Sequence, residues 1–191
     1  NMQSFKDWLN RNVVCNDMQS FKNWLNRTEA KRYNTTMDAT FLFLSGITVI
    51  PKFVQYMQLH TLTLRDCQIE ELPEFIYSLK LKYLAIINCP LRKISKRISE
   101  IKSLRDFTCK RTQITKIPKA FNELKLELLE LTCNHITKIP VLSNVMILNL
   151  MGNNIKTISD LSLMTDIGKI YLTSKCHAVL NETFVLPKDW S

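Results

Sequence analysis

Cysteine, histidine and carboxylate side chains are the groups in this chain that could do chemistry, and their spacing decides which chemistry. The cysteines are spread singly, with no Cys-x-x-Cys pair and no Cys–His spacing typical of a zinc site. This pattern favours buried structural thiols over metal ligands, redox centres or a disulfide framework. The cysteines are Cys15, Cys67, Cys89, Cys109, Cys133 and Cys176, and the histidines are His60, His135 and His177.

The remaining reactive groups do not form a pattern typical of a catalytic site. His60 and His135 each follow a residue of the repeat described below, so both are expected in turns or on the surface. Glu70 and Glu71 are adjacent in a turn and are interpreted as solvated charge. Glycine occurs 3 times, and neither GxGxxG nor GxxxxGK[ST] is present. We expect no enzymatic activity, no catalytic residues, no cofactor and no metal.

Composition and cysteine usage predict a cytoplasmic, intracellular protein. The chain has 191 residues, of which 46% are hydrophobic, enough for the core of one domain. No apolar run reaches the roughly 20 residues that cross a bilayer. The first residues lack the apolar segment of a signal peptide, so secretion is disfavoured. Three glycosylation sequons, at Asn26, Asn34 and Asn181, argue weakly for the opposite.

An internal repeat positions most of these residues. Prolines recur at Pro51, Pro73, Pro118 and Pro140, and Ser95 stands where a further one would fall. Alignment on them gives units such as LHTLTLRDCQIEELPEFIYSLK and LRDFTCKRTQITKIPKAFNELK. The units start at Leu59, Leu81, Leu104, Leu126 and Val145, with a weaker copy at Met37 and a degenerate one at Ile167.

The shared pattern, LxxLxLxxNxIxxIPxxIxxLxx, resembles the leucine-rich repeat of the ordinary class with about 22 residues per unit. The resemblance implies an α/β solenoid, a curved stack of about seven coils with a parallel concave β-sheet. It divides the chain into a duplicated helical N-terminal cap (1–36), the repeats (37–179) and a C-terminal cap or tail (180–191). It also implies a non-enzymatic protein-interaction module.

Residue periodicity supports this architecture independently. In LxxLxL the last two leucines alternate with other residues, as in a strand with one buried face. The proline that follows cannot continue a sheet, because it has no N–H to donate. Inward strand residues are Leu62, Leu64, Leu84, Ile86, Leu129, Leu131, Leu148 and Leu150. Inward residues after the turn are Ile69, Leu91, Ile114, Ile136 and Ile155, and the convex side contributes Phe75, Ile98, Phe121 and Leu142.

The asparagine position of the repeat is where this chain departs from the pattern. In the family that asparagine is buried and hydrogen-bonds the backbone of the next coil. Cys and Thr can also donate, but less well than an amide with two N–H groups. We interpret the cysteines here as structural members of this ladder. A buried unpaired Lys175 is disfavoured, so regular stacking is expected to end near it. The ladder positions are Ser45, Cys67, Cys89, Thr112, Asn134, Asn153 and Lys175.

A duplicated decapeptide precedes the repeats. MQSFKDWLNR at 2–11 returns as MQSFKNWLNR at 18–27, and each copy places Met, Phe, Trp and Leu on one stripe of a helix. The second copy is the better candidate for shielding the open end of the first coil. The first copy either packs beside that cap or docks on a partner or a second protomer. The sequence leaves both open.

The strand residues between the inward leucines are expected to form the binding face. Large apolar residues and Arg on one contiguous surface are typical of a protein interface. The alternative is a face that only fills the sheet or self-associates. The predicted partner-binding residues are Phe43, Arg65, Tyr83, Ile87, Lys110, Arg111, Leu128, Glu130, Met151 and Tyr171.

A formal net charge of +9 accompanies a predicted basic edge near the IP motif. This edge is a solvated, solubilising surface, a site for an acidic protein partner, or a site for nucleic acid or anionic lipid. Nucleic acid is the least favoured, because no aromatic residues for base stacking alternate with the basic ones. The edge consists of Arg92, Lys93, Lys116, Lys138 and Lys156.

The sequence therefore predicts a non-enzymatic module that binds a partner protein on its concave face. Two alternatives stay open. One is a structural or regulatory subunit that oligomerises through the N-terminal helices. The other is a pathogen or viral effector that binds a host protein.

Overall fold

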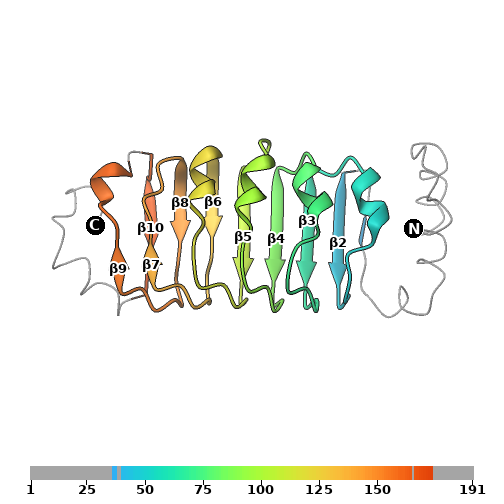
Figure 1. Cartoon of the computed structure of the whole chain (residues 1–191), viewed down its shortest axis with the longest axis horizontal. Helices are drawn as coiled ribbons and strands as arrows, with labels where there is room; N and C mark the ends of the chain where they lie inside the picture. The colour runs from blue at the N-terminus through green and yellow to red at the C-terminus, as the bar shows by residue number, and fades with distance from the viewer. Residues whose placement is uncertain (1–35, 38–39, 165, 174–191) are drawn as a thin grey trace.

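The computed structural model describes residues 36–37, 40–164 and 166–173 (Figure 1). One sheet contains eight strands in the order β1-β2-β3-β4-β5-β6-β8-β10. Its strands are β1 (Thr36–Met37), β2 (Phe41–Ser45), β3 (Thr61–Arg65), β4 (Tyr83–Ile87), β5 (Asp106–Lys110), β6 (Leu126–Glu130), β8 (Val145–Asn149) and β10 (Lys169–Tyr171). A second sheet pairs β7 (Lys138–Ile139) with β9 (Thr157–Ile158).

The chain winds as a solenoid, one strand per coil. From β2 to β10 each strand pairs in parallel with the next strand of the large sheet. These seven parallel strands confirm the predicted stack of about seven coils. The return paths lie across the core from the sheet (Figure 1) and contain short 3-10 helices. These are η1 (Lys52–Tyr56), η2 (Glu74–Ser78), η3 (Lys96–Glu100), η4 (Lys119–Glu123) and η5 (Leu161–Leu163).

The sheet begins with a strand of opposite direction. β1 is antiparallel to β2, with Thr36 opposite Phe43 and Met37 opposite Leu42. The weaker repeat copy expected from Met37 therefore starts with a short antiparallel pairing, and its parallel strand begins only at Phe41. Both decapeptide copies, and the tail at 180–191, lie outside the described residues.

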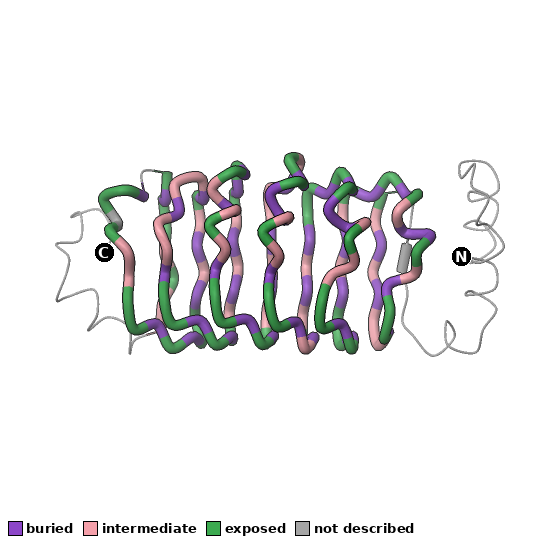
Figure 2. Tube along the Cα trace, viewed as in Figure 1, coloured by how far each residue is buried: buried purple, intermediate pink, exposed green. Residues whose placement is uncertain are grey.

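A continuous apolar core fills the space between the sheet and the return paths. All eight predicted inward strand residues are buried, and so are all five aliphatic residues after the turns. Figure 2 shows buried positions alternating with more exposed ones along the strands. Each fully buried Leu or Ile contributes about 1.5–3 kcal/mol of hydrophobic stabilisation. No coil can bury these side chains alone, so the stack folds through contacts between coils.

Prolines and one serine set the start of the first four 3-10 helices. Pro51, Pro73 and Pro118 precede η1, η2 and η4 with φ between −63° and −68°. Ser95 adopts the same φ of −64° before η3 without a ring. Its Oγ accepts a hydrogen bond from the Arg97 N–H at 3.2 Å, which caps the helix. Serine thus replaces the missing proline by a side-chain cap.

The convex side differs from the sequence prediction at one residue. Ile98 and Phe121 are fully buried, each three residues after the start signal, and Leu142 is also buried. In the second coil the residue three after Pro73 is Ile76, which is fully buried, whereas Phe75 only packs against the core from outside. The prediction of Phe75 was therefore wrong by one position, because the 3-10 helix turns its third residue inward.

The polar ladder forms between coils as expected for most positions. Asn153 Nδ2 donates to the carbonyls of Leu131 at 2.8 Å and Leu150 at 2.9 Å. Cys67 and Cys89 are buried, and their thiols donate to the preceding coil over longer distances, to Leu44 O at 3.5 Å and Leu64 O at 3.9 Å. The cysteines are therefore ladder members, with weaker bonds than asparagine makes.

The first coil lacks a ladder residue. Ser45 pairs with Arg65 at the end of the strand and is half-buried, so its assignment to the ladder was wrong. From Leu44 to the next buried aliphatic, Ile47, the chain advances three residues, whereas the following coil takes five from Leu64 to Ile69. The shorter turn omits the position. Lys175 lies outside the described residues.

A left-handed residue directly precedes each of the five ladder residues from Cys67 to Asn153, and Gly46 takes the same conformation before Ile47 in the first coil, which the sequence did not predict. The φ values are positive at Gly46, Asp66, Asn88, Arg111, Cys133 and Gly152, from 49° at Arg111 to 75° at Gly152. The turn after the strand requires this conformation to direct the next side chain into the core. Non-glycine residues there carry a conformational cost of about 1–2 kcal/mol.

Gly152→Ala is expected to destabilise the chain by about 1–2 kcal/mol. A Cβ on Gly152 would meet Cys133 Sγ at 2.9 Å and the Cys133 backbone at 3.1 Å, at a φ of +75°. Gly168→Ala is the matched control, because its Cβ would meet only Met146 O, at 3.5 Å. Urea denaturation of both variants measures the difference. Equal midpoints for the two variants would contradict the left-handed turn at Gly152.

None of the helices in the described ranges combines the length and the hydropathy that would let it cross a bilayer.

Candidate protein-binding face

The strand register aligns the outward side chains into columns across the sheet. We call these columns the concave face. Their order follows the parallel pairing of β2 through β10. The first column is Phe41, Thr61, Tyr83, Asp106, Leu128, Ile147 and Lys169. The second is Phe43, Thr63, Ala85, Thr108, Glu130, Asn149 and Tyr171, and the third begins Ser45, Arg65, Ile87 and Lys110.

Large apolar side chains of this face reach solvent. Tyr83 is 50% exposed and Tyr171 43%, and Met151, in the turn that follows β8, is 48% exposed. Phe43, Ile87 and Leu128 are half-buried between their neighbours in the columns. The sequence therefore placed the strand residues on the outer side of the sheet correctly, whereas Met151 lies in the turn after its strand. The face mixes large apolar side chains with polar and charged ones, and backbone pairing holds every strand of it.

Lys110 and Glu130 form an ion pair in the middle of the concave face. Lys110 Nζ lies 2.7 Å from Glu130 Oε1, and the Glu130 side chain is only 16% exposed. Asn149 Nδ2 also donates to Glu130 Oε1, at 3.4 Å. Lys110, on the neighbouring strand, thus neutralises the charge of the Glu130 carboxylate. Two predicted site residues are brought together, and Asn149 is a contact that sequence reasoning missed.

Asp106 is the contrasting carboxylate of the face. It lies in the first column, between Tyr83 and Leu128. Within the described part of the chain, no cation lies within ion-pair distance of it, and its carboxylate has no hydrogen-bond donor. Desolvation, with a smaller repulsion from Glu127, raises the pKa of Asp106 above its usual value. Sequence reasoning placed Asp106 in the column but did not single it out.

The two predicted arginines lie at the margin of the face. Arg65 ends β3 and is exposed, opposite Ser45 on one side and Ile87 on the other. Arg111 follows β5 with a φ of 49° and is also exposed. Neither guanidinium pairs with a carboxylate in the described residues.

Two of the five residues of the predicted basic edge are neutralised by ion pairs. Arg92 Nε lies 3.3 Å from Glu70 Oε2, and Lys93 Nζ lies 2.7 Å from Glu71 Oε1. The two glutamates occupy the same turn one coil earlier, so they meet the basic pair across the stack. All four side chains are more than half exposed, which limits each pair to about 0–1 kcal/mol.

The other lysines of the edge have no carboxylate partner among the described residues. They are Lys116, Lys138 and Lys156, and all three are exposed. Thr157, rather than Lys156, lies opposite Lys138 in the β7–β9 pair. Lys156 is therefore offset by one residue from the column. The edge contains three unpaired lysines and not a continuous basic stripe.

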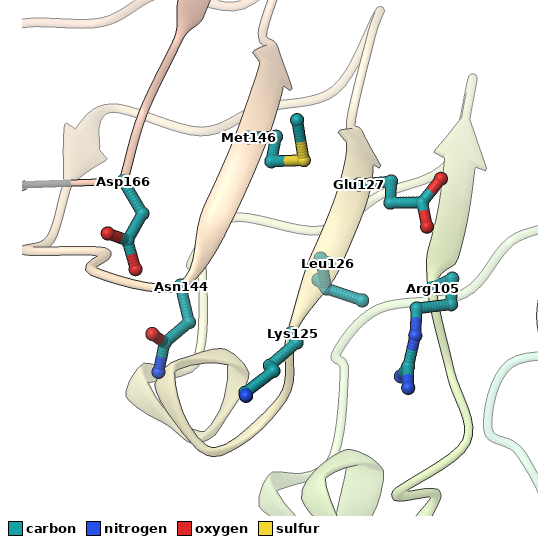
Figure 3. A pocket seen from close by; sticks show the side chains of 7 residues that line it. All are labelled: Arg105, Lys125, Leu126, Glu127, Asn144, Met146 and Asp166. Atoms are coloured by element: carbon teal, nitrogen blue, oxygen red, sulfur yellow. The ribbon is translucent and has the colours of Figure 1, made fainter.

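A shallow cavity of about 370 Å³ adjoins the concave face where β5, β6 and β8 begin. Figure 3 shows Glu127 extending toward β5, whereas the Arg105 guanidinium extends away toward the start of its strand. Arg105 Nη1 donates to the carbonyls of Lys102 at 3.3 Å and Leu104 at 2.9 Å. The lining is Arg105, Lys125, Leu126, Glu127, Asn144, Met146 and Asp166.

The cysteines and histidines of the described region differ in burial and in the pKa of their side chains. Cys67, Cys89 and Cys109 are buried free thiols, and Cys133 is an exposed one. A hydrogen bond with Cys89 lowers the pKa of the Cys67 thiol to about 7, and the same bond raises the pKa of Cys89. Burial raises the pKa of Cys109 to about 12. His60 and His135 are exposed, as expected. No cluster of three metal-ligating residues occurs in the described ranges.

The repeat, the parallel coil strands and the inter-coil ladder together define a leucine-rich-repeat fold, which is commonly a protein-interaction module. The chain is similar to a leucine-rich-repeat protein of Leptospira interrogans, with 23% identity, a TM-score of 0.49, and coverage of 64% of this chain and 40% of that one. It is also similar to internalin C2 from Listeria monocytogenes, with 21% identity, a TM-score of 0.36, and coverage of 69% and 80%.

The chain thus spans less than half the length of the Leptospira protein. No protein-family model matches the chain, and no curated protein matches it. At TM-scores below 0.5, the repeat geometry of the chain itself, rather than these two likenesses, identifies the fold.

Proposed function

We propose that the protein binds a partner protein on its concave face. The observation that supports this most is the exposure of Tyr83 on β4 and Tyr171 on β10, both on a sheet whose backbone is already paired, together with the exposed Met151 in the turn after β8. Aromatic residues and Met are enriched where proteins bind each other. A preformed surface also loses little conformational entropy on binding, which favours affinity.

The basic edge supports a secondary role in the same proposal. Lys116, Lys138 and Lys156 are exposed and have no carboxylate partner among the described residues, so they attract an acidic region of the partner during encounter. Their contribution falls with ionic strength, because exposed charges are screened beyond about 8 Å at physiological salt. The exposed apolar residues of the concave face provide the affinity, and the edge affects the association rate.

Tyr83→Ala is expected to reduce partner capture at least tenfold, a loss of about 1.4 kcal/mol, because an aromatic anchor is removed from the interface centre. Affinity capture from cell lysates with the immobilised full chain, quantified by mass spectrometry, measures the loss. Because Tyr83 is half exposed, its truncation should change the free energy of unfolding by no more than about 0.5 kcal/mol.

Tyr56→Ala is the matched control for this experiment. Tyr56 is 51% exposed, like Tyr83, but lies on η1 of the convex side. The same proteins should be captured by this variant as by the unmodified chain. Capture that survives Tyr83→Ala and fails with Tyr56→Ala would move the site to the convex side. Capture of the chain itself would identify the concave face as a self-association surface.

A further inference from the structure

The concave face contains two carboxylates in its columns, and only one of them is neutralised. Glu130 has Lys110 at 2.7 Å and Asn149 at 3.4 Å. Asp106, on the neighbouring strand, has neither a cation nor a hydrogen-bond donor among the described residues. An interface core seldom contains an unpaired charge, because removal from water costs several kcal/mol unless a partner charge replaces the water.

The surroundings of Asp106 are apolar within its column. Tyr83 precedes it on β4, and Leu128 and then Ile147 follow it on β6 and β8. Adjacent strands lie about 4.8 Å apart, so all three are within reach of one short segment of a partner. A partner covering Tyr83 and Leu128 would therefore also cover Asp106.

Basic residues near Asp106 are engaged elsewhere, distant or not paired with it. The Lys82 carbonyl accepts the Asp106 N–H at 3.1 Å, but the Lys82 ammonium makes no ion pair with Asp106 in the described residues. The Arg105 guanidinium donates to the carbonyls of Lys102 and Leu104. Lys169, the basic end of the same column, is three strands away, roughly 14 Å at the usual strand spacing. That distance exceeds the Debye length of about 8 Å at physiological salt. Glu127 adds negative charge next to Asp106 and raises its pKa further.

We propose that Asp106 forms an ion pair with an arginine or lysine side chain of the partner protein. Apolar partner residues on either side of that cation would cover Tyr83 and Leu128. This inference rests on the proposed function and specifies the chemistry of its partner. A guanidinium is the better fit, because it can pair with the carboxylate and stack on the ring of Tyr83 at the same time. Partner residues on both sides would exclude water and strengthen the pair.

A peptide array tests this recognition directly. Immobilised extended peptides have leucine or tyrosine on both sides of a central arginine, lysine, citrulline or glutamate, and the full chain is applied in solution. Citrulline keeps the shape of arginine without its charge. The unmodified chain should bind arginine-centred peptides at least tenfold better than citrulline-centred ones. Asp106→Asn should reduce that preference to less than twofold.

Glu123→Gln is the matched charge control, because it removes one carboxylate at an exposed position of η4, on the convex side. It should leave the arginine preference unchanged. Asp106→Arg should reverse the preference, so that glutamate-centred peptides bind better than arginine-centred ones. This reversal is a gain of binding, which a merely unfolded variant cannot produce.

The outcomes separate this inference from the proposed function. Tyr83-dependent binding with equal signals for arginine and citrulline would overturn the role of Asp106 and leave the concave face as the site. The absence of any Tyr83-dependent binding, with or without a cationic peptide, would overturn both. An arginine preference that persists in Asp106→Asn would assign the cation to another carboxylate and also overturn the inference.

Stability against pH provides a readout that needs no peptide. Because folding raises the pKa of Asp106, its ionisation opposes folding, so this unfavourable contribution grows as the pH rises from about 3.8 through the folded pKa. Asp106→Asn should therefore gain in melting temperature relative to the unmodified chain over this range. The negative charge of Glu127 also acts on Asp106, so the comparison is repeated in a Glu127→Gln background. A relative loss in both backgrounds would mean that Asp106 is already paired.

Discussion

Phe121→Ala is expected to lower the free energy of unfolding by about 3–5 kcal/mol, the largest effect of any single substitution proposed for this chain. Phe121 is fully buried in the return path of its coil. Its ring packs against Phe107 with centroids 5.3 Å apart and planes tilted by 53°. The substitution removes this aromatic contact and leaves a cavity between sheet and convex side. Urea denaturation followed by circular dichroism measures the loss.

Phe75→Ala is the control for Phe121→Ala. Both phenylalanines belong to 3-10 helices that start after a proline, but Phe75 stands at the second position and is only half-buried. Its truncation should cost less than half as much. A larger loss at Phe75 would show that the second coil buries this ring instead of Ile76. The free energy of unfolding of a domain is about 5–15 kcal/mol, so Phe121→Ala removes a large share of it.

Asn134→Ala is expected to cost about 2–4 kcal/mol, because it leaves several buried polar groups without a partner. Asn134 Nδ2 donates to the carbonyls of Cys109 at 2.8 Å and Leu131 at 3.0 Å. Its Oδ1 accepts hydrogen bonds from the Thr112 N–H at 3.1 Å and the Thr112 hydroxyl at 2.5 Å. One side chain thus joins two coils through both ends of its amide. Thermal and urea unfolding of the variant measure the loss.

Cys89→Ala is the matched ladder substitution and should cost less than about 1.5 kcal/mol. Its thiol reaches Leu64 O only at 3.9 Å, so little hydrogen-bond energy is lost. Similar losses for Asn134→Ala and Cys89→Ala would show that the ladder stabilises by packing alone. A much larger loss at Asn134 would show that the amide hydrogen bonds join the coils.

The residues that face the core could be predicted because their spacing alone determines them. Strand alternation and the 22-residue period placed Leu62, Leu84 and Leu129 on the buried side and Tyr83 on the outer side, and the structure agrees. These assignments depend only on the direction of each side chain along its own coil. The stack of about seven coils follows from the count of repeats. The repeats do not identify a binding partner.

The local conformation of each turn was decided by the tertiary structure and could not be predicted from the sequence. A turn that is two residues shorter moved Ser45 out of the ladder, and the third position of the 3-10 helix places Ile76 rather than Phe75 in the core. The left-handed turns at Arg111 and Cys133 were equally unexpected, because the sequence there lacks the glycine that usually marks them. Periodicity describes the average unit and does not register such insertions and deletions.

Charge pairing across the stack was decided only by the tertiary structure. Residues about 22 positions apart meet through the stacking of coils, so Arg92 reaches Glu70 and Lys110 reaches Glu130, whereas Asp106 meets no cation in the described region. Composition predicted a basic edge but not which members are neutralised. The sequence by itself therefore determined the coil, its buried residues and its outer face. The stacking of coils decided which charges on that surface remain available to a partner, because a pair needs two side chains within about 4 Å, and only the packed coils set that distance.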